Sequence, residues 1–432
     1  MKLSDLVKLE LIPALGCTEP IAIALASAKA REVLGCPVSD VKKVRVRADR
    51  MVYRNGFGVG IPGSNLSGNE FAAALGAVAG DAAKGLEVLS KVEQKDIDAA
   101  VELVKENKVD VALAPDEHEL FVSAEIFSEQ DTAKAVIRKV HNKISEISRN
   151  GELISAETAE RDEFDLLFEE SKFFKDKGIE ELIAIAESID KAEERELLNG
   201  VKINKAISDY GIEHGSGLGI GKNIFEMVQA GKIGDSEMIR AKYMVAGGVD
   251  ARMSGVFMPV MSSGGSGNSG ISATLPIAAV YEFRKMDNSR KLAEALMLSH
   301  LLNVYIRLYI GRLSSVCGGS IAAGTGAAAG ITYLLGGTPA QVFEAIKLMI
   351  ESVFGVICDG AKPGCSLKLS SAASSAVLFA TLALKNSRIS AKEGILDFDL
   401  PRLLQNLESI TKNGYKDVDN LVIKILERKK DK

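Results

Sequence analysis

The chain contains no tryptophan, and aromatic residues fill only 5% of its 432 positions. Glycine, by contrast, occurs 40 times, which predicts a core of small and aliphatic side chains with closely approaching backbones. No strongly basic segment is present and the formal net charge is −5, so nucleic acid is not an expected partner.

Cysteine is also scarce, and its number is odd. The five cysteines are Cys17, Cys36, Cys317, Cys358 and Cys365. The first residues do not have the pattern of a secretory signal peptide. These features exclude a disulfide framework and predict free or metal-bound thiols in a reducing cytoplasm.

Two long stretches lack any charged residue, namely residues 253–281 and 313–343. Their length raises the question of a membrane span. Both are interrupted by glycine and serine, and the first also contains Pro259 and Pro276. We therefore expect buried central segments of the fold and no membrane partner.

The length predicts two or three domains. Strand-like alternation is concentrated in residues 38–160, together with helical periods, which predicts a domain with mostly antiparallel strands. Residues 161–432 show almost only helical periods and predict a large all-helical domain. Residues 1–37 are expected to be a helical segment that packs on this second domain. The predicted class is α+β.

Two glycine-rich turns carry the three downstream cysteines. Six residues, among them Pro363, separate Cys358 from Cys365, so no helix runs through this stretch. Cys317 lies in a second turn, forty residues upstream. Three thiolates from two turns can hold a soft metal centre and leave one coordination position open.

The identity of this centre is open on spacing alone. A zinc site usually recruits histidine, but the four histidines, at positions 118, 141, 214 and 300, have no such spacing. An iron–sulfur cluster with three protein ligands fits better. The alternative is three unrelated buried thiols, since free cysteine is often buried.

Cys17 precedes a predicted helix that begins with Thr18 as its N-cap and Glu19 in its first turn. The positive end of the helix dipole is expected to stabilise the Cys17 thiolate. The alternative is that Cys17 is only a small packing residue at a turn.

A glycine-rich break at residues 262–270 contains the dinucleotide pattern G-x-G-x-x-G, but residues 58–63 match it too, and no βαβ succession surrounds either. Exposed amides there, with serine and asparagine side chains, could bind a smaller anion such as an amino-acid carboxylate. The candidate residues are Ser263, Gly264, Ser266, Gly267 and Asn268. A tight crossing between helices is the alternative.

Six motifs, in order, are similar to those of the L-cysteine desulfidase family, which is related to the α part of iron–sulfur L-serine dehydratases. They are Gly-Cys-Thr-Glu-Pro-Ile-Ala at 16–22, Asn-Gly-Phe-Gly-Val-Gly-Ile-Pro-Gly at 55–63, Asp-Ala-Arg-Met-Ser-Gly at 250–255, Ser-Gly-Asn at 266–268, Ile-Gly-Arg-Leu-Ser-Ser-Val-Cys-Gly at 310–318 and Ile-Cys-Asp-Gly-Ala-Lys-Pro-Gly-Cys at 357–365.

The resemblance implies a [4Fe–4S] cluster held by Cys317, Cys358 and Cys365, without pyridoxal phosphate. Two positions depart from the family pattern: Ser269 replaces a glutamine and Ser366 an alanine. The separate β part of serine dehydratases does not stand out here, which favours the stand-alone desulfidase group.

The expected activity is α,β-elimination of L-cysteine to hydrogen sulfide, pyruvate and ammonia. Cys17 is the candidate base, and Lys362 is a candidate catalytic cation or else a solvated loop residue. The alternatives are an L-serine dehydratase and a non-enzymatic iron–sulfur sensor or metal-binding module. The expected partners are a small amino-acid substrate and, in a homo-oligomer, further copies of the chain.

Overall fold

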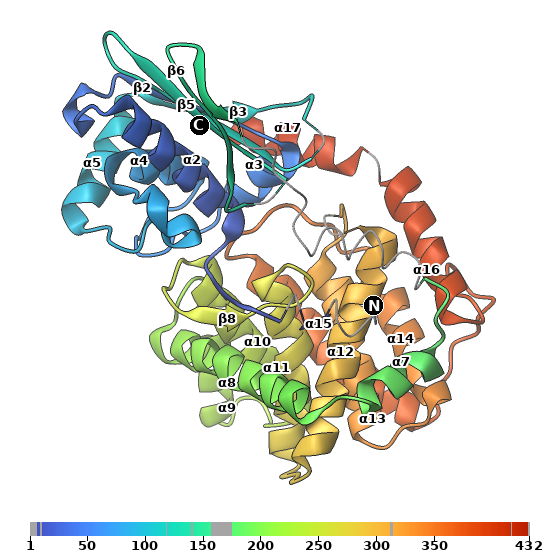
Figure 1. The fold of residues 1–432 in the computed structure, drawn as a ribbon. Helices are drawn as coiled ribbons and strands as arrows, with labels where there is room; N and C mark the ends of the chain where they lie inside the picture. The colour runs from blue at the N-terminus through green and yellow to red at the C-terminus, as the bar shows by residue number, and fades with distance from the viewer. Residues whose placement is uncertain are drawn as a thin grey trace.

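The structure is a computed structural model with two parts, a sheet covered by helices and a larger helical body (Figure 1). The described residues are 7–8, 11–117, 119–139, 141–156, 175–311, 314–415 and 417–430, without the side chains of Leu15 and Lys430. The domain boundary expected at residue 160 lies outside them. Each part has its own hydrophobic core, and the α+β class is confirmed.

The sheet has six strands in the order β3-β2-β4-β5-β6-β7. They are β2 (Lys43–Ala48), β3 (Val109–Leu113), β4 (Phe121–Phe127), β5 (Thr132–Arg138), β6 (Ile144–Arg149) and β7 (Glu152–Ala156). Only β2 and β3 pair in parallel, and the other four pairs are antiparallel, as expected. Along β2, buried Val44 and Val46 alternate with partly exposed arginines, so one face of the strand joins the core.

The sheet is accompanied by α2 (Thr18–Leu34), α3 (Arg50–Gly56), α4 (Asn69–Ala79) and α5 (Gln94–Lys105). Short 3-10 turns lie at Val38–Asp40 and Ala82–Glu87. Residues 1–37 were expected to pack on the helical body; Val7, Leu11 and Cys17 lie in its core, but helix α2 belongs to the core of the sheet part. The reason is that α2 is apolar nearly all round, with buried residues on every face, so it fits between the sheet and α4.

The helical body is built from helices α7 to α16. They are α7 (Ile179–Glu187), α8 (Lys191–His214), α9 (Ile220–Gln229), α10 (Glu237–Met253), α11 (Gly267–Phe283), α12 (Ser289–Ile310), α13 (Gly324–Leu334), α14 (Pro339–Val353), α15 (Cys365–Leu384) and α16 (Leu400–Ser409), with π-helical turns at Gly319–Ala323 and Ile410–Gly414. Helix α12 is buried from Ala295 to Ile310 and lies at the centre of this body (Figure 1).

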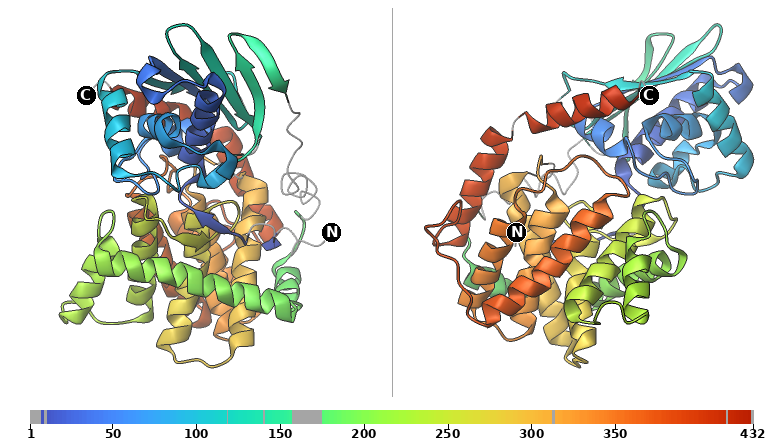
Figure 2. Two further views of the ribbon diagram at one scale, coloured as in Figure 1. Left: turned by 60° about the vertical axis from the view of Figure 1, so that its left-hand side comes forward. Right: turned by 180° about the vertical axis from the view of Figure 1, so that it is seen from behind.

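Two segments cross between the parts. Strand β1 (Pro13–Leu15), just before α2, pairs antiparallel with β8 (Pro259–Met261) of the helical body. From the other end of the chain, α17 (Val418–Lys430) returns to the sheet part (Figure 2), where Ile423 joins its core. The N-terminal cysteine motif is therefore held against both parts.

The charge-free stretches are buried, interrupted segments of the helical body, as expected. Within the described residues, one other helix, α15, is long and apolar enough to cross a membrane by length and composition. Its central residues pack into the core, including Leu369, Ala373 and Ala380. Length and composition of this kind are shared by core helices, so the finding carries little weight alone.

Candidate functional site

The two cysteine turns lie side by side in the structure. Val316 and Ile357 form an isolated antiparallel bridge. The backbone N–H of Cys317 donates to Val356 O at 2.8 Å, and that of Cys358 donates to Ser315 O at 2.8 Å. Cys365 is the first residue of α15, one tight turn further on. The fold thus gathers the three cysteines that spacing singled out.

Their electrostatics show the same proximity. Burial above all, with the neighbouring Cys317 and Cys358, raises the pKa of Cys365 to about 11. Burial and Cys358 likewise raise the pKa of Cys317. The buried thiols of Cys317 and Cys365 therefore keep their protons unless a metal centre replaces them.

Within the described part of the chain, no three His, Cys, Asp or Glu side chains are arranged to hold a single metal ion. A cluster of several irons spreads its cysteine ligands over more space than one ion does, and its usual ligands are thiolates. The all-sulfur donor set of Cys317, Cys358 and Cys365 therefore fits a cluster better than a lone ion.

Ion pairs stabilise the loop between Cys358 and Cys365. Asp359 forms ion pairs with both Lys362 and Lys368, and Lys368 Nζ also donates to Ile357 O at 2.9 Å. Although burial lowers the pKa of Lys368, Asp359 and the nearby thiols raise it on balance. Lys362 is thus paired within the loop. Lys368, which the sequence analysis missed, is the second cation beside the cysteines.

The same loop contacts the sheet part through Arg54. Arg54 of α3 donates from Nη1 to Cys358 O at 3.5 Å and forms an ion pair with Asp419 of α17. Gly360 has φ +94°, and a Cβ there would overlap Arg54 O. Only glycine fits this position, because it tolerates both the left-handed backbone and the close approach.

Cys17 lies at the N-terminus of α2, where it is itself the N-cap in place of the expected Thr18. Its thiol donates to Glu19 Oε2 at 3.1 Å. Burial raises the pKa of Cys17 well above its usual range, and the negative charge of Glu19 adds to this. The expected stabilisation of the thiolate by the helix dipole is therefore outweighed. Cys17 belongs to the core cluster against which Cys317 and Cys365 pack, and the charge of Cys365 also raises the pKa of Cys17.

Glu19 is a functional candidate that the sequence analysis missed. Its other oxygen, Oε1, accepts from Asn55 Nδ2 at 2.8 Å, and Thr18 Oγ1 donates to Oε2 at 3.3 Å. Burial raises the pKa of Glu19, but the positive charge of His141 and the hydrogen bonds from Asn55 and Cys17 lower it on balance. The Cys17 thiol thus donates its hydrogen bond to an ionised carboxylate. Its position two residues after Cys17 was the available signal.

The glycine-rich loop forms a tight turn that begins α11. Ser263 and Ser266 exchange backbone hydrogen bonds of 3.1 and 3.2 Å, and Ser266 Oγ, the N-cap, accepts from Ser269 N. The Ser263 hydroxyl is already engaged by His300 Nδ1 at 2.8 Å and Asn303 Nδ2 at 2.9 Å. Burial lowers the pKa of His300 to about 4, so this network is neutral at pH 7.

The remaining candidates of this loop face two arginines. Arg252 Nη1 donates to Asn268 Oδ1 at 3.0 Å, and a Cβ on Gly267 would lie 2.5 Å from Arg252 Nε. A Cβ on Gly264 would lie 2.9 Å from Arg307 Nε. Arg252 Nη2 also donates to Gly16 O at 2.7 Å, which ties this loop to the Cys17 segment.

Ser269 and Ser366, the two residues that depart from the family pattern, both form hydrogen bonds. Ser269 Oγ accepts from Arg307 Nη2 at 2.7 Å, and a Cβ on Gly318, next to Cys317, would lie 2.6 Å from that same nitrogen. Ser366 Oγ donates to Pro363 O at 3.0 Å, which closes the first turn of α15 behind the cysteine loop.

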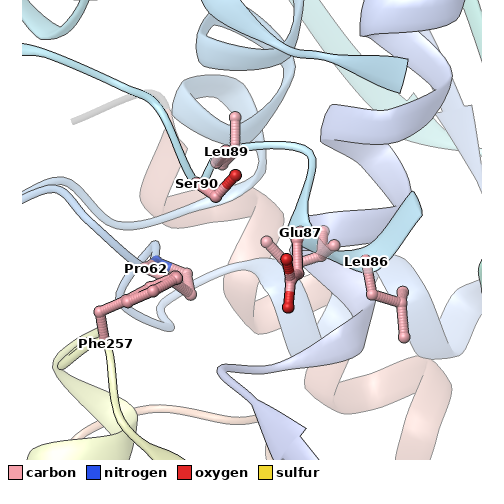
Figure 3. A pocket seen from close by; sticks show the side chains of 7 residues that line it. Pro62, Leu86, Glu87, Leu89, Ser90 and Phe257 are labelled. Atoms are coloured by element: carbon pink, nitrogen blue, oxygen red, sulfur yellow. The ribbon is translucent and has the colours of Figure 1, made fainter. Parts of the chain in front are cut away.

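A small hollow of about 10 Å³ lies between the two parts, beside Pro62, Leu86 and Phe257 (Figure 3). It has room for roughly one water molecule. None of the cysteines lines this hollow. Pro62 lines it and also contacts Gly16, so the hollow lies beside the Cys17 segment but is not part of the site.

Comparison with known proteins places the chain in a family of enzymes. Residues 83–424 match the serine dehydratase alpha chain family, and the chain belongs to that family. Such a family implies an enzyme of the lyase type.

Similar proteins cover almost the whole chain. A UPF0597 protein of Desulfatibacillum aliphaticivorans is 37% identical over 432 residues, covering 98% of both chains. A UPF0597 protein of Alkaliphilus oremlandii is 38% identical over 435 residues, covering 99% of both, and one of Clostridioides difficile is 38% identical over 423 residues, covering 98% of both.

Proposed function

We propose that the protein catalyses the α,β-elimination of L-cysteine to hydrogen sulfide, pyruvate and ammonia. The observation that carries this proposal is that the Cys317 and Cys358 turns pair side by side, and that Cys17, bonded to Glu19, belongs to the core cluster against which Cys317 and Cys365 pack. A thiol-rich centre beside a buried proton acceptor suits removal of a sulfur leaving group and a neighbouring proton.

In this proposal, Cys317, Cys358 and Cys365 hold a [4Fe–4S] cluster. A bound cluster would supply a Lewis-acidic iron that stabilises the departing sulfide without a change of redox state. The protein contributes the loop that fixes the ligands. Asp359, with Lys362 and Lys368, keeps that loop closed and places positive charge beside the thiolates.

Proton transfer is assigned to the Cys17–Glu19 pair. Glu19 orients the Cys17 side chain across the 3.1 Å hydrogen bond, and the thiolate form of Cys17 removes the α-proton of the substrate. The electron pair of that C–H bond forms the Cα–Cβ double bond as the C–S bond breaks and the sulfur leaves. The aminoacrylate product tautomerises and reacts with water to give pyruvate and ammonia.

An L-serine dehydratase is the second candidate, because the matching family is that of the serine dehydratase alpha chain. The same residues would then remove the α-proton while hydroxide leaves. The two activities differ only in the leaving group, so substrate preference separates them.

The first test is an anaerobic assay of pyruvate and sulfide with L-cysteine and L-serine as substrates. We expect turnover of L-cysteine to exceed that of L-serine. Turnover of L-serine alone would support the dehydratase, and no turnover of either would favour a non-enzymatic sensor.

The second test replaces Cys17 by Ala. We expect turnover of L-cysteine to fall by about 10²-fold or more, because the base is lost, while iron content stays unchanged. Cys36→Ala is the matched control, since Cys36 packs against the core of the sheet part. Full activity of the Cys17 variant would refute its role as base, and loss of iron would make Cys17 a ligand.

A further inference from the structure

Arg252 is a buried cation without a carboxylate partner in the part of the chain that the structure describes. The residue is only 6% exposed, at the C-terminal end of α10. Its two hydrogen bonds go to neutral oxygens, Gly16 O and Asn268 Oδ1. Burying a charge is costly unless an opposite charge accompanies it, so this arrangement points to an anion from outside the chain.

Asp250 and Glu19, the acidic residues nearest in sequence to Arg252 and to Gly16, are engaged elsewhere. Asp250 lies two residues before it, but its Oδ2 accepts from Gly221 N at the start of α9. The carboxylate of Glu19 is occupied by Asn55, Thr18 and Cys17. Neither carboxylate forms an ion pair with Arg252 among the described residues.

The guanidinium retains donors for such an anion. A guanidinium has five N–H groups, and two of those of Arg252 are used by Gly16 and Asn268. Its Nε is buried and has no hydrogen-bond partner among the described residues. A carboxylate is the anion that a guanidinium binds with two parallel hydrogen bonds.

Arg252 Nε is also next to the start of a helix. Gly267, whose Cβ would lie 2.5 Å from this nitrogen, is the first residue of the 17-residue helix α11. The N–H groups of a first helical turn have no partner within the helix and favour negative charge. Ser266 Oγ uses the N–H of Ser269, which leaves those of Gly267 and Asn268 for an anion.

We propose that Arg252, together with the backbone N–H groups of Gly267 and Asn268, binds the α-carboxylate of the amino-acid substrate. This inference rests on the proposed function. Gly16 O, which Arg252 contacts, directly precedes Cys17, and the positive charge of Arg252 acts on the Cys17 thiol. A carboxylate held here would therefore present the adjacent α-carbon to Cys17 and its sulfur to the cysteine turns.

The test compares two ligands that differ only in charge, 3-mercaptopropionate and 3-mercaptopropionamide, by calorimetric titration of the anaerobically purified protein. We expect the carboxylate to bind at least about 10-fold more tightly than the amide, because only the carboxylate is an anionic acceptor. Equal affinities, or no binding of the carboxylate, would overturn the proposal without any variant.

The variant Arg252→Gln should lose about 10- to 100-fold in affinity for 3-mercaptopropionate and change little for the amide. Arg252→Lys should fall between, because an ammonium cannot form the two parallel hydrogen bonds. Arg240→Gln is the control, since Arg240 lies on the same helix in an exposed ion pair with Asp235. A folded Arg252→Gln that binds the carboxylate like the wild type would contradict the assignment.

These titrations are independent of turnover. Carboxylate-selective binding that depends on Arg252, in a protein that does not convert L-cysteine, would uphold this site and refute the lyase proposal. Turnover of L-cysteine, with equal affinities for 3-mercaptopropionate and 3-mercaptopropionamide, would support the lyase proposal and refute this site.

Discussion

Glu19 is the residue on which the chemistry of Cys17 depends most directly. It is an ionised carboxylate 3.1 Å from the thiol, and its negative charge is one cause of the raised pKa of Cys17. Arg252 acts on the same thiol with the opposite sign. Single residues with opposed charges therefore set how readily Cys17 releases its proton.

The variant Glu19→Gln removes that negative charge. We expect the pKa of Cys17 to fall, because the remaining cause of its rise is mainly burial. The pH dependence of thiolate absorbance in the metal-free protein, with Cys17→Ala subtracted, measures this. Glu32→Gln, at an exposed position of the same helix, should leave it unchanged. An unaltered or raised pKa would show that Glu19 does not act on the thiol.

The same substitution has a consequence for stability. The pKa of folded Glu19 lies below its ordinary value of 4.5, so its ionisation stabilises the fold above that pH. This contribution is lost as the pH falls below 4.5 through the folded pKa. Glu19→Gln should therefore flatten the decline of the unfolding free energy with pH in this acidic range, as measured by urea denaturation at a series of pH values.

At the scale of elements, the site is built where helices and strands end. Cys17 caps α2, Cys365 begins α15 and Gly267 begins α11, so each contributes from a helix N-terminus. Strand β1 fixes the first of these against the helical body through its pairing with β8. The packing of α2 therefore determines where Cys17 lies.

The variant Gly76→Ala tests this packing. Gly76 of α4 crosses α2 so closely that a Cβ would overlap the backbone of Ala24. We expect a loss of about 1–3 kcal/mol in the free energy of unfolding, because the helices must move apart. In Gly234→Ala the new Cβ meets no atom within 4 Å, so its unfolding free energy should change by less than about 0.5 kcal/mol. Equal stability of the two variants would refute the close crossing.

Sequence patterns predicted these elements unevenly. Alternation in β2 and the turns around Cys317, Cys358 and Cys365 are local signals, and they predicted the antiparallel sheet and the gathering of the three cysteines. The partner of α2 was not predictable, because a helix that is apolar all round has no face that indicates its neighbour.

The raised pKa of Cys17 and the unpaired charge of Arg252 depend on burial by segments far away in the chain. A local motif carries no information on such burial. Lys368 was missed for a similar reason, since it reaches Asp359 across one turn that only the folded loop creates.

At the scale of the whole molecule, the C-terminal helix joins the two parts. Helix α17 lies against α3 (Figure 2), with Arg50 donating to Asn420 and Arg54 paired with Asp419. Since Arg54 also donates to Cys358 O, the end of the chain supports the cysteine loop from the sheet part.

The variant Asp419→Asn should leave the buried guanidinium of Arg54 without its charge partner. We expect a loss of about 1–3 kcal/mol in unfolding free energy and faster removal of iron by a chelator. Asp417→Asn, at an exposed position directly before α17, is the control. An iron-loss rate equal to that of the wild type would show that α17 does not support the loop.

The most direct test of the account is iron analysis of the protein purified without oxygen, in the wild type and in Cys358→Ser, with Cys36→Ser as the control. We predict about four irons per wild-type chain with a broad absorption near roughly 400 nm, retained in Cys36→Ser and lost in Cys358→Ser. A colourless, iron-free wild type that still releases sulfide from L-cysteine would contradict it.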